Sequence, residues 1–483
     1  MDKTTLSALL KDIEVTMTPG MDPAVGGVAY RSDRVAQGDA FFCVPGFKSD
    51  GHSFAADAAA RGAAALVVER PVDVDLPQAI VSDTRRALAL ASALVYGRPT
   101  EKMDVVGITG TNGKTTTTYL MDSILRAAGL TTGIIGTVET RVAGERLASA
   151  RTTPESADLQ ALFSDMVDKG VSAASVEVSS HAIDLHRVDG VHFAVAAFTN
   201  LTQDHLDYHH TLEEYFSVKR RLFREADVDE RVVNIDDEHG RALAAELDAV
   251  LTVGRAPEAE VRAEDEENDA TRSRFTLVTP LGSAGLELPL AGAYNVSNAL
   301  VAAGCAVALG IDLEAIVRGL EHAPQVPGRL ERIDEGQPFS VLVDYAHTPD
   351  SLEKAIGAVR SVTPGRVITV FGCGGDRDPE KRPVMGEAAG AGSDLVVVTS
   401  DNPRSEDPVG IILHIEDGLR STGTDYTVEI DRRKAIAAAF AEAREGDAVL
   451  IAGKGHEDYQ VFLDRTIHFD DREVAREELR ARC

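Results

Sequence analysis

The sequence has few of the residues that build disulfide frameworks and cysteine-based metal sites. Its 483 residues include four cysteines and no tryptophan. The cysteines, at positions 43, 305, 373 and 483, form no C-x-x-C pair and match no metal-ligand spacing. We interpret them as reduced thiols of a cytosolic protein.

Long apolar runs are also missing. The longest uncharged apolar stretch, residues 299–311, contains glycines and is too short to cross a bilayer. The first five residues, Met1-Asp2-Lys3-Thr4-Thr5, have no basic segment leading into an apolar core, so we predict no signal peptide. We therefore expect a cytoplasmic protein without a membrane partner.

Positive charge is scarce. Lysine and arginine number 49 and aspartate and glutamate 78, so the net charge is 49 − 78 = −29. A field of this sign repels phosphates and argues against nucleic acid or an anionic membrane surface as partner. A phosphorylated small molecule remains compatible, because it needs only a local cluster of donors. The most acidic stretch, residues 256–274, is predicted to be a solvated surface loop.

The order of apolar and polar segments predicts three α/β domains. The sequence breaks at residues 97–100 and 324–328, which divides it into 1–100, 101–328 and 329–483. In the second and third parts, apolar strands run into glycine-rich or polar segments. Ligands of open α/β sheets bind outside the carboxyl ends of the strands, so functional residues are expected there.

One such segment predicts a phosphate-binding loop. An apolar strand leads into residues 107–117, Gly-Ile-Thr-Gly-Thr-Asn-Gly-Lys-Thr-Thr-Thr, and a helix follows. Backbone N–H groups of such a loop bind phosphate, Lys114 can reach the β and γ phosphates, and the Thr115 hydroxyl can bind Mg²⁺. Ile108 occupies a position where the general pattern has glycine. The alternative is a strand, turn and helix that contain Gly-Lys-Thr by chance.

Two metal-ligand candidates follow strands in the same domain. Glu177 lies where an apolar run turns polar, and His205 follows the apolar run 193–198. Alone, each is more typical of a surface residue or a satisfied core residue. Downstream of a phosphate loop, each becomes a candidate ligand for the divalent cation that phosphoryl transfer needs.

Lys219 is an unusual lysine. It falls on the apolar stripe of a predicted helix, formed by Leu212, Tyr215, Phe216, Leu222 and Phe223. A lysine in this position is costly to bury unless it is paired, extends its amine to solvent or changes its chemistry. Burial favours the neutral amine, and a neutral amine can react with CO₂ to give a carbamate, which is an anionic metal ligand. The residues alone leave these alternatives open.

Taken together, the motifs resemble those of the Mur ligase family of ATP-dependent amide-forming enzymes. The resemblance covers nearly the whole chain and rests on seven segments: residues 110–115, 177–181, 199–207, 295–298, 328–329, 344–349 and 453–457. It implies a three-domain α/β architecture with a central P-loop ATPase-like parallel sheet and a Rossmann-like C-terminal domain. Residues 344–349, 401–404 and 453–457 resemble the members that add meso-diaminopimelate to UDP-N-acetylmuramoyl-L-alanyl-D-glutamate.

The resemblance also implies roles for single residues. The implied catalytic residues are Lys114, Glu177, His205 and Lys219. The implied ATP-binding residues are Gly110, Thr111, Asn112, Gly113, Lys114, Thr115, Thr116, Asn295, Arg329 and Asp344. The implied Mg²⁺ ligands are Thr115, Glu177, His205 and Lys219 as its carbamate. The implied uridine diphosphate pocket contains Ser32, Phe47, Lys48 and Ser49, and the muramoyl dipeptide would contact Thr152, Thr153, Ser179 and Arg187. The implied diaminopimelate site contains Arg377, Asp401, Asn402, Pro403, Arg404, Gly453 and Glu457.

The implied reaction belongs to peptidoglycan precursor synthesis. ATP would phosphorylate the D-glutamyl γ-carboxylate, because hydroxide is a poor leaving group, and the amine of diaminopimelate would then displace phosphate. Arg404 offers a planar fork for the second carboxylate of diaminopimelate, unless it pairs with Asp401 or Glu406. We expect ATP as a substrate, Mg²⁺ as a cofactor and a monomer.

Three other functions stay open at this point. A lysine-adding ligase of the same family would require Arg404 not to bind a carboxylate. A folylpolyglutamate synthase shares the phosphate loop but lacks the Asp-Asn-Pro-Arg segment at 401–404. A regulatory ATP-binding protein would form no amide and would give the motifs of the third domain no role.

Overall fold

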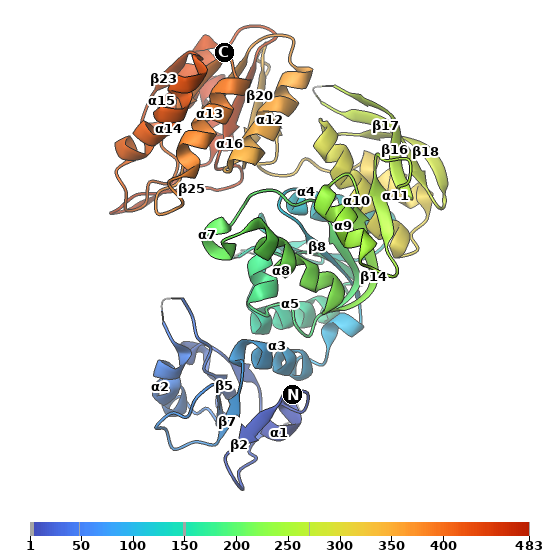
Figure 1. The fold of residues 1–483 in the computed structure, drawn as a ribbon, viewed down its shortest axis with the longest axis vertical. Coiled ribbons are helices and arrows are strands. Elements are labelled where there is room, and N and C mark those ends of the chain that lie inside the picture. The colour runs from blue at the N-terminus through green and yellow to red at the C-terminus, as the bar shows by residue number, and fades with distance from the viewer. Residues whose placement is uncertain (1–3, 48, 148–150, 270, 483) are drawn as a thin grey trace.

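The computed structural model describes residues 4–47, 49–147, 151–269 and 271–482. It consists of three α/β domains stacked along the long axis (Figure 1), with the N-terminal domain at one end and the C-terminal domain at the other. Each domain has its own sheet. The three-domain α/β architecture predicted from the sequence is confirmed.

The N-terminal domain contains a five-stranded sheet of order β2-β7-β6-β5-β4, parallel except for β2. Its strands are β1 (Thr4–Thr5), β2 (Val15–Met17), β3 (Ala24–Val25), β4 (Val28–Ala29), β5 (Ala40–Phe42), β6 (Ala65–Val68) and β7 (Gln78–Val81). Its helices are α1 (Leu6–Leu9), α2 (Ala55–Ala60) and α3 (Thr84–Val95), with short 3₁₀ turns at Ser32–Arg34, Gly51–Phe54 and Pro99–Glu101. Asp83 caps α3 by accepting hydrogen bonds from two backbone N–H groups.

The central domain is an eleven-stranded sheet of order β11-β10-β9-β12-β8-β13-β14-β15-β16-β17-β18. Strands β9, β12, β8, β13, β14, β15 and β16 run parallel, and hairpins extend both edges. The strands are β8 (Asp104–Thr109), β9 (Thr132–Ile135), β10 (Thr140–Val142), β11 (Glu145–Leu147), β12 (Ala173–Glu177), β13 (His192–Phe198), β14 (Asp227–Asn234), β15 (Leu251–Gly254), β16 (Val261–Asn268), β17 (Ser273–Thr279) and β18 (Gly282–Leu288).

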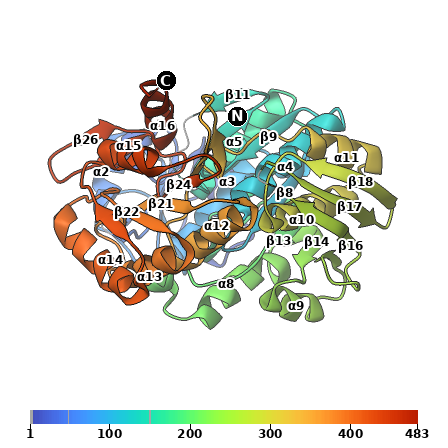
Figure 2. The ribbon, with the colours of Figure 1, turned by 90° about the horizontal axis from the view of Figure 1, so that it is seen from above.

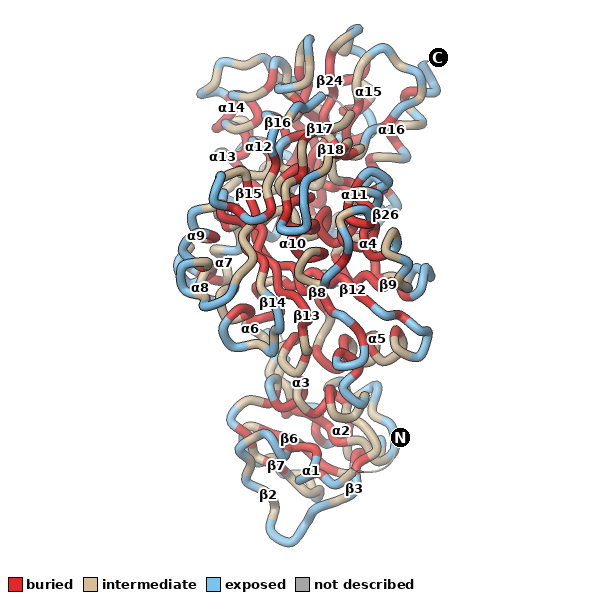
Figure 3. Tube along the Cα trace, turned by 90° about the vertical axis from the view of Figure 1, so that its right-hand side faces the viewer, coloured by how far each residue is buried: buried red, intermediate tan, exposed pale blue. Residues whose placement is uncertain are grey.

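Helices cover both faces of this central sheet. They are α4 (Lys114–Ala127), α5 (Ser156–Asp168), α6 (Ser180–Asp184), α7 (Leu206–His209), α8 (Leu212–Arg224), α9 (Glu238–Ala245), α10 (Ala293–Ala308) and α11 (Leu313–Glu321). Side chains on alternate positions of β8 enter opposite cores, Val106 and Ile108 on one face and Val105 on the other. Strands buried on both faces explain the continuous apolar runs seen in the sequence. The red segments of the tube in Figure 3 follow this buried sheet through the middle of the molecule.

The C-terminal domain has a six-stranded sheet of order β19-β20-β24-β21-β22-β23, parallel except for β19. Its strands are β19 (Glu331–Ile333), β20 (Ser340–Asp344), β21 (Val367–Phe371), β22 (Leu395–Val398), β23 (Tyr426–Val428), β24 (Ala448–Ala452), β25 (Tyr459–Val461) and β26 (Thr466–His468). Its helices are α12 (Pro349–Val362), α13 (Lys381–Gly392), α14 (Pro408–Thr422), α15 (Arg432–Glu442) and α16 (Asp471–Arg480). Seen from above, α12, α13 and α14 lie on one side of strands β21 and β22, and α15 and α16 lie on the other side (Figure 2).

The acidic stretch 256–274 differs from its prediction as a loop. Residues Val261–Asn268 form β16, which pairs antiparallel with β17. Val261 and Ala263 are buried, while Glu264 and Glu267 are exposed. The stretch is therefore solvated, as predicted, but alternating burial and backbone pairing make it a strand.

The segment between the central and C-terminal domains packs tightly on the last domain. Gly328 has φ +65°, and a Cβ there would lie 2.2 Å from the backbone carbonyl carbon of Gly455. Only glycine fits this left-handed position at so close a backbone approach. No helix in the described parts of the chain is long and apolar enough to span a membrane.

Candidate active site

The phosphate loop joins β8 to α4 at the carboxyl edge of the central sheet. Gly113 is the N-cap of α4 with φ +86°, and a Cβ there would lie 2.2 Å from Asn298 Oδ1. The segment 199–202 supports the loop from outside: Thr199 Oγ1 donates to Asn112 O at 2.7 Å, and Asn200 Oδ1 accepts from Asn112 N at 3.0 Å. The loop is therefore held open around the N-terminus of α4, as an anion site requires.

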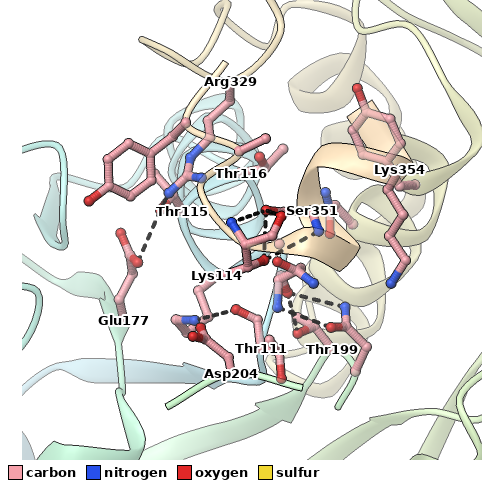
Figure 4. A pocket seen from close by; sticks show the side chains of 18 of the residues that line it. Thr111, Lys114, Thr115, Thr116, Glu177, Thr199, Asp204, Arg329, Ser351 and Lys354 are labelled. Atoms are coloured by element: carbon pink, nitrogen blue, oxygen red, sulfur yellow. Dashed lines mark hydrogen bonds between the residues drawn. The ribbon is translucent and has the colours of Figure 1, made fainter. Parts of the chain in front are cut away.

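A cavity of about 480 Å³ opens on this loop. Figure 4 shows its lining, with side chains from the phosphate loop facing side chains of the C-terminal domain. It brings together most of the residues predicted for the nucleotide and metal: Thr111, Asn112, Gly113, Lys114, Thr115, Thr116, Glu177, His205, Lys219, Arg329 and Asp344. Residues distant in sequence thus share one chamber at the edge of the central sheet.

Thr115 and Glu177 form the oxygen-rich corner of the cavity. Thr115 Oγ1 donates to Glu177 Oε2 at 3.0 Å, and Thr137 donates to the same carboxylate from its N–H and its hydroxyl. Glu177 is 1% exposed. Mg²⁺ prefers one or two carboxylates, phosphate and water over a full protein cage, so this hydroxyl and carboxylate fit that ion. Within the described residues, no group of three or more His, Cys, Asp or Glu side chains could hold a metal ion without other ligands.

Two lysine amines converge on the loop carbonyls. Lys114 Nζ donates to Gly110 O at 2.9 Å and Thr111 O at 2.7 Å, and Lys219 Nζ donates to Gly110 O at 2.9 Å. Lys219 is 1% exposed and lies 4.7 Å from the centre of the Tyr215 ring. Burial, together with the nearby Lys114 charge, holds the pKa of Lys219 well below its ordinary value. The structure thus excludes the solvent-extended alternative, and burial of the amine favours its neutral form.

His205 reaches the same cavity from a left-handed turn. It has φ +54°, and its ring lies 4.9 Å from the ring of His181. Its Nε2 atom is 3.5 Å from Asp204 Oδ2, and the side chain is 43% exposed. His205 therefore stands at the open side of the chamber, whereas Glu177 stands at its buried side.

The far end of the cavity is built by α10 and the start of the C-terminal domain. Asn295 is buried, donates from Nδ2 to Ala291 O at 2.8 Å and stands next to the lining residue Tyr294. Asp344 accepts from the N–H groups of Leu330 at 2.7 Å and Ala346 at 2.8 Å. Burial raises the pKa of Asp344. This carboxylate fixes the backbone beside Arg329.

Arg329 crosses from the C-terminal domain to the phosphate loop. Its Nη2 donates to Thr115 Oγ1 at 3.3 Å, and its guanidinium carbon lies 4.8 Å from the centre of the Tyr345 ring. Asp350, in the first turn of α12, accepts from Asn112 Nδ2 at 3.0 Å and from Thr202 Oγ1 at 2.9 Å. The two domains therefore meet directly over the loop.

The residues predicted for the dipeptide lie beside Glu177. Thr153 Oγ1 donates to the backbone carbonyl of Glu177 at 2.7 Å, and Thr152 Oγ1 lies 3.0 Å from Thr137 Oγ1. Arg187 donates to Thr153 O at 3.1 Å, and the Ser179 hydroxyl accepts from Thr153. These side chains form one continuous wall from the oxygen-rich corner toward the N-terminal domain.

The residues predicted for the uridine diphosphate pocket lie outside this cavity, in the N-terminal domain. Phe47 is 76% exposed and its ring lies 5.9 Å from that of Tyr208 in the central domain. Ser32 begins a 3₁₀ turn, the Ser49 carbonyl accepts from Gly46 N, and Lys48 lies outside the described residues.

Sequence reasoning missed Arg85, which joins the two regions. Arg85 donates to Pro45 O at 3.0 Å and to Glu155 Oε2 at 3.2 Å, and Glu155 Oε1 is 3.0 Å from Arg187. Nothing in its sequence neighbourhood marks it, because it stands in the first turn of an ordinary capped helix.

In the C-terminal domain, the strand ends gather the residues predicted for the amino acid. Asn402 Nδ2 donates to Glu457 Oε2 at 2.8 Å, Asp401 is 6% exposed, and a Cβ on Gly453 would lie 3.3 Å from Asp401 Oδ2. Burial and the nearby Asp401 raise the pKa of Glu457. Pro403 is buried and its carbonyl accepts from Glu406 N, while Arg377 points toward its own neighbour's carbonyl.

Arg404 is not paired with either of the carboxylates that the sequence offered as partners, Asp401 and Glu406. It adopts φ +53°, and its Nη1 donates to Gly375 O at 2.7 Å. Glu406 pairs instead with Arg382, at 2.9 Å. Within the described part of the chain Arg404 makes no ion pair, so the alternative that it serves only to pair with Asp401 or Glu406 is wrong.

Lys454 is a second residue that sequence reasoning missed. Its amine is fully buried, 3.5 Å from Asp401 Oδ1, 3.4 Å from Glu457 Oε2 and 3.4 Å from Asn402 Oδ1. It supplies the positive charge that allows two carboxylates to be buried side by side. The only signal in the sequence was its place between Gly453 and Gly455 after an apolar strand.

Three family models match the chain. The model described as Mur ligase middle domain matches residues 108–306, and the one described as Mur ligase, glutamate ligase domain matches residues 328–455. The model described as Mur ligase family, catalytic domain matches residues 24–102. Together these matches cover most of the chain.

Curated proteins and solved structures resemble the chain over its whole length. It is 50% identical over 462 residues to the UDP-N-acetylmuramoyl-L-alanyl-D-glutamate–2,6-diaminopimelate ligase of Solibacter usitatus, with 94% of each chain covered. It is 48% identical over 471 residues to the Geobacillus kaustophilus protein of the same name, with 96% of each covered. A solved structure under that name has a TM-score of 0.72 at 31% identity, covering 100% of this chain and 99% of the other.

Proposed function

This chain belongs to the Mur ligase family, and from that premise we propose that it is the ATP-dependent ligase that adds 2,6-diaminopimelate to UDP-N-acetylmuramoyl-L-alanyl-D-glutamate. One observation carries the choice of amino acid. Asp401 and Asn402 are buried, the half-buried Glu457 accepts a hydrogen bond from Asn402, and the guanidinium of Arg404, two residues further along the chain, has no carboxylate partner among the described residues.

The reaction has two steps. The D-glutamyl γ-carboxylate oxygen attacks the γ-phosphorus of ATP, the bond to the bridging oxygen breaks, and ADP leaves. The free amine of diaminopimelate then attacks the carbonyl carbon of the acyl phosphate and loses a proton. The bond between that carbon and the phosphate oxygen breaks, and inorganic phosphate leaves with the electron pair of this bond. The chain contributes position and charge, because both steps bring anionic groups together.

Lys114 and Arg329 are placed to neutralise phosphate charge at the loop. Lys114 currently donates to the Gly110 and Thr111 carbonyls, and it exchanges these contacts for phosphate oxygens when ATP binds. Arg329 stands over Thr115. Asn295 and Asp344 act by shaping the far end of the chamber, where they fix α10 and the backbone at residue 330.

Mg²⁺ would be held at this oxygen-rich corner by Thr115, Glu177 and His205, and by Lys219 once it is carbamylated. When bound, Mg²⁺ screens the charge of the transferring phosphoryl group. The observation supporting Lys219 is its burial next to Gly110 O, because a buried neutral amine is the form that reacts with CO₂. The carbamate supplies the negative charge that the amine cannot.

We assign a different substrate, or part of a substrate, to each of the three domains. We assign residues 1–100 to the uridine diphosphate end through Ser32, Phe47, Lys48 and Ser49, and residues 101–328 to ATP. Within the central domain, Thr152, Thr153, Ser179 and Arg187 hold the dipeptide beside Glu177. Residues 329–483 hold the amino acid, with Arg377 and Arg404 facing its distal carboxylate and Asp401, Asn402, Gly453 and Glu457 facing its ammonium groups. We expect a monomer that works in the cytoplasm.

The test is phosphate release in the presence of ATP, Mg²⁺ and UDP-N-acetylmuramoyl-L-alanyl-D-glutamate. We expect release with meso-diaminopimelate and at least tenfold less with L-lysine. The reason is that lysine lacks the second carboxylate and leaves Arg404 unpaired. Release with lysine alone would keep the ligase and reject the role of Arg404, and release with neither amino acid would reject the ligase.

A further inference from the structure

Tyr345 lies between the nucleotide cavity and the amino-acid cluster and contacts both. It follows Asp344 at the carboxyl end of β20. The guanidinium carbon of Arg329 is 4.8 Å from the centre of its ring, and its hydroxyl donates to Glu457 Oε1 at 3.4 Å. A single side chain thus touches a residue of each proposed substrate site.

On the nucleotide side, the contact is a cation–π interaction. Arg329 lies over the Tyr345 ring and donates to Thr115 Oγ1 at 3.3 Å. Its Nε is buried and has no hydrogen-bond partner within the described residues, so the ring face is what orients this edge of the guanidinium. Any shift of the ring changes the direction of Arg329 over the phosphate loop.

On the amino-acid side, the contact is to the oxygen of Glu457 that the cluster leaves free. Asn402 and Lys454 both hold Oε2, at 2.8 and 3.4 Å. The Tyr345 hydroxyl is the hydrogen-bond donor to Oε1. The rotation of the carboxylate, and so the direction of its acceptor atoms, depends on Tyr345.

The backbone around Tyr345 makes the two contacts move together. A Cβ on Gly455 would lie 2.6 Å from the Cβ of Tyr345 and 2.8 Å from Gly328 O. The glycine therefore packs directly between Tyr345 and the residue that precedes Arg329. The ring is also flanked by His347, with ring centres 4.5 Å apart, and by His456, at 5.0 Å. Because the Tyr345 ring is packed against these groups, it cannot shift on one side without shifting the groups on the other side.

We propose that Tyr345 is a positioning residue that couples the two sites, so that nucleotide bound at Arg329 raises the affinity of the Glu457 cluster for the incoming amino acid. The inference rests on the proposed function. Coupling between two binding sites is reciprocal, so the amino acid raises nucleotide affinity by the same factor. Tyr345 touches no reacting atom and acts through Arg329 and Glu457.

The experiment compares Tyr345→Phe with a matched Tyr426→Phe control in the full-length protein. Tyr426 also donates to a carboxylate in the C-terminal domain, Glu416 Oε1 at 2.9 Å, but it lies on the edge strand β23. Calorimetry measures meso-diaminopimelate affinity, at saturating UDP-N-acetylmuramoyl-L-alanyl-D-glutamate, with and without ADP and Mg²⁺. Circular dichroism melting confirms that each variant is folded.

For the wild type and Tyr426→Phe, we expect ADP to raise diaminopimelate affinity by about fivefold or more, the lower end of ordinary coupling. For Tyr345→Phe, we expect the ADP effect to fall below twofold while ADP affinity itself stays unchanged, because the ring remains. Tyr345→Leu removes the ring as well, so both the coupling and the ADP affinity should fall.

Two results would overturn the coupling role. One is a wild type that binds both ligands independently, and the other is a Tyr345→Phe variant with the full ADP effect. In either case, diaminopimelate binding and amino-acid-dependent phosphate release by the wild type would leave the proposed function standing. A wild type that binds ADP but no diaminopimelate and releases no phosphate would reject the proposed function itself.

Discussion

The nucleotide site and the amino-acid site are built in different ways. The phosphate loop is one continuous segment, residues 110–115, at the N-terminus of α4, and we propose that its backbone N–H groups bind phosphate. The amino-acid cluster is assembled from the ends of three strands, at residues 374–377, 401–404 and 453–457, and depends on buried side-chain charges. The first is specified locally. The second exists only when the third domain has folded.

This difference predicts which substitutions damage one site and spare the other. Changes at the loop should abolish turnover and leave diaminopimelate binding in the absence of nucleotide intact. Changes in the cluster should raise the KM for the amino acid and leave the KM for ATP nearly constant. A variant that affects both KM values equally would indicate that the two sites are a single unit.

The largest effect is expected for Lys114→Ala. Loss of the ammonium group from the phosphate loop removes charge stabilisation of the transferring phosphoryl group, so kcat should fall on the order of 10³-fold or more. Phosphate release measures it. Lys169→Ala, which removes a surface lysine paired with Asp165 and Glu145, should leave kcat unchanged. Normal turnover by Lys114→Ala would remove this lysine from the site.

The second effect tests the oxygen-rich corner. Lys219→Ala should lower kcat on the order of 10²-fold to 10³-fold, because the proposed carbamate ligand is lost. Millimolar acetate or formate should restore part of the activity by placing a carboxylate in the vacated space. Full activity of the variant without added acid would reject the carbamate.

The third effect belongs to the cluster. Arg404→Ala should raise the KM for meso-diaminopimelate by at least about 30-fold, as expected when one partner of a buried charged pair is removed. The KM for ATP should stay within twofold. Arg420→Ala is a fitting control, since Arg420 pairs with Glu416 and Asp417 on the exposed face of α14. Equal increases in both KM values would instead assign Arg404 a structural role.

Local patterns were sufficient for the first site and for only part of the second. The loop and the place of Lys219 on the apolar stripe of a helix follow from contiguous sequence and helical periodicity, both of which reflect short-range geometry. The burial of the Lys219 amine did not follow from the sequence, which left a solvent-extended amine open. Arg404 was predicted as a ligand of the amino acid, but its freedom from Glu406 depends on Arg382, which lies on α13. Tyr345 and Lys454 stand in the segments 344–349 and 453–457 that the sequence singled out, and Arg85 stands in no such segment. The contacts of Lys454 with Asp401, of Tyr345 with Glu457 and of Arg85 with Glu155 join residues far apart along the chain, and no local pattern records such contacts.

The same limit explains the acidic stretch at 256–274. Its charge suggested a loop, yet Val261 and Ala263 alternate toward the core and β17 supplies the hydrogen bonds of a strand. Arg255 and Arg262 pair with Glu266 and Glu264, which reduces the repulsion that the sequence alone implied. Arg262 and Glu264 lie two residues apart on β16, whereas Arg255 reaches Glu266 across 11 residues, a contact that composition does not specify.

The smallest predicted effect concerns His456, which lies beside the Tyr345 ring, and it depends on pH. Burial, with the charges of Arg329 and Arg472, lowers the pKa of His456 to about 3. In the unfolded chain this group titrates near 6.5, so between the two values the unfolded state binds more protons, and stability falls as pH falls. From pH 7.5 to 5.5 the loss should be about 1.4 kcal/mol.

The difference between the wild type and His456→Gln isolates this contribution. The wild type should lose about 3–6 °C more in Tm than the variant over that pH range, measured by calorimetric melting in matched buffers. Parallel pH dependence of the two proteins would show that His456 is protonated equally in the folded and unfolded states.

The close packing of Gly328 on Gly455 also bears on how the protein can be divided into fragments. Gly328 is part of the surface against which the backbone of Gly455 and His456 packs. A C-terminal fragment that starts at residue 329 would lack this support. Ligand binding by such a fragment would therefore report on an amino-acid cluster whose conformation differs from that in the intact protein. Fragments intended for screening ligands should therefore begin upstream of Gly328.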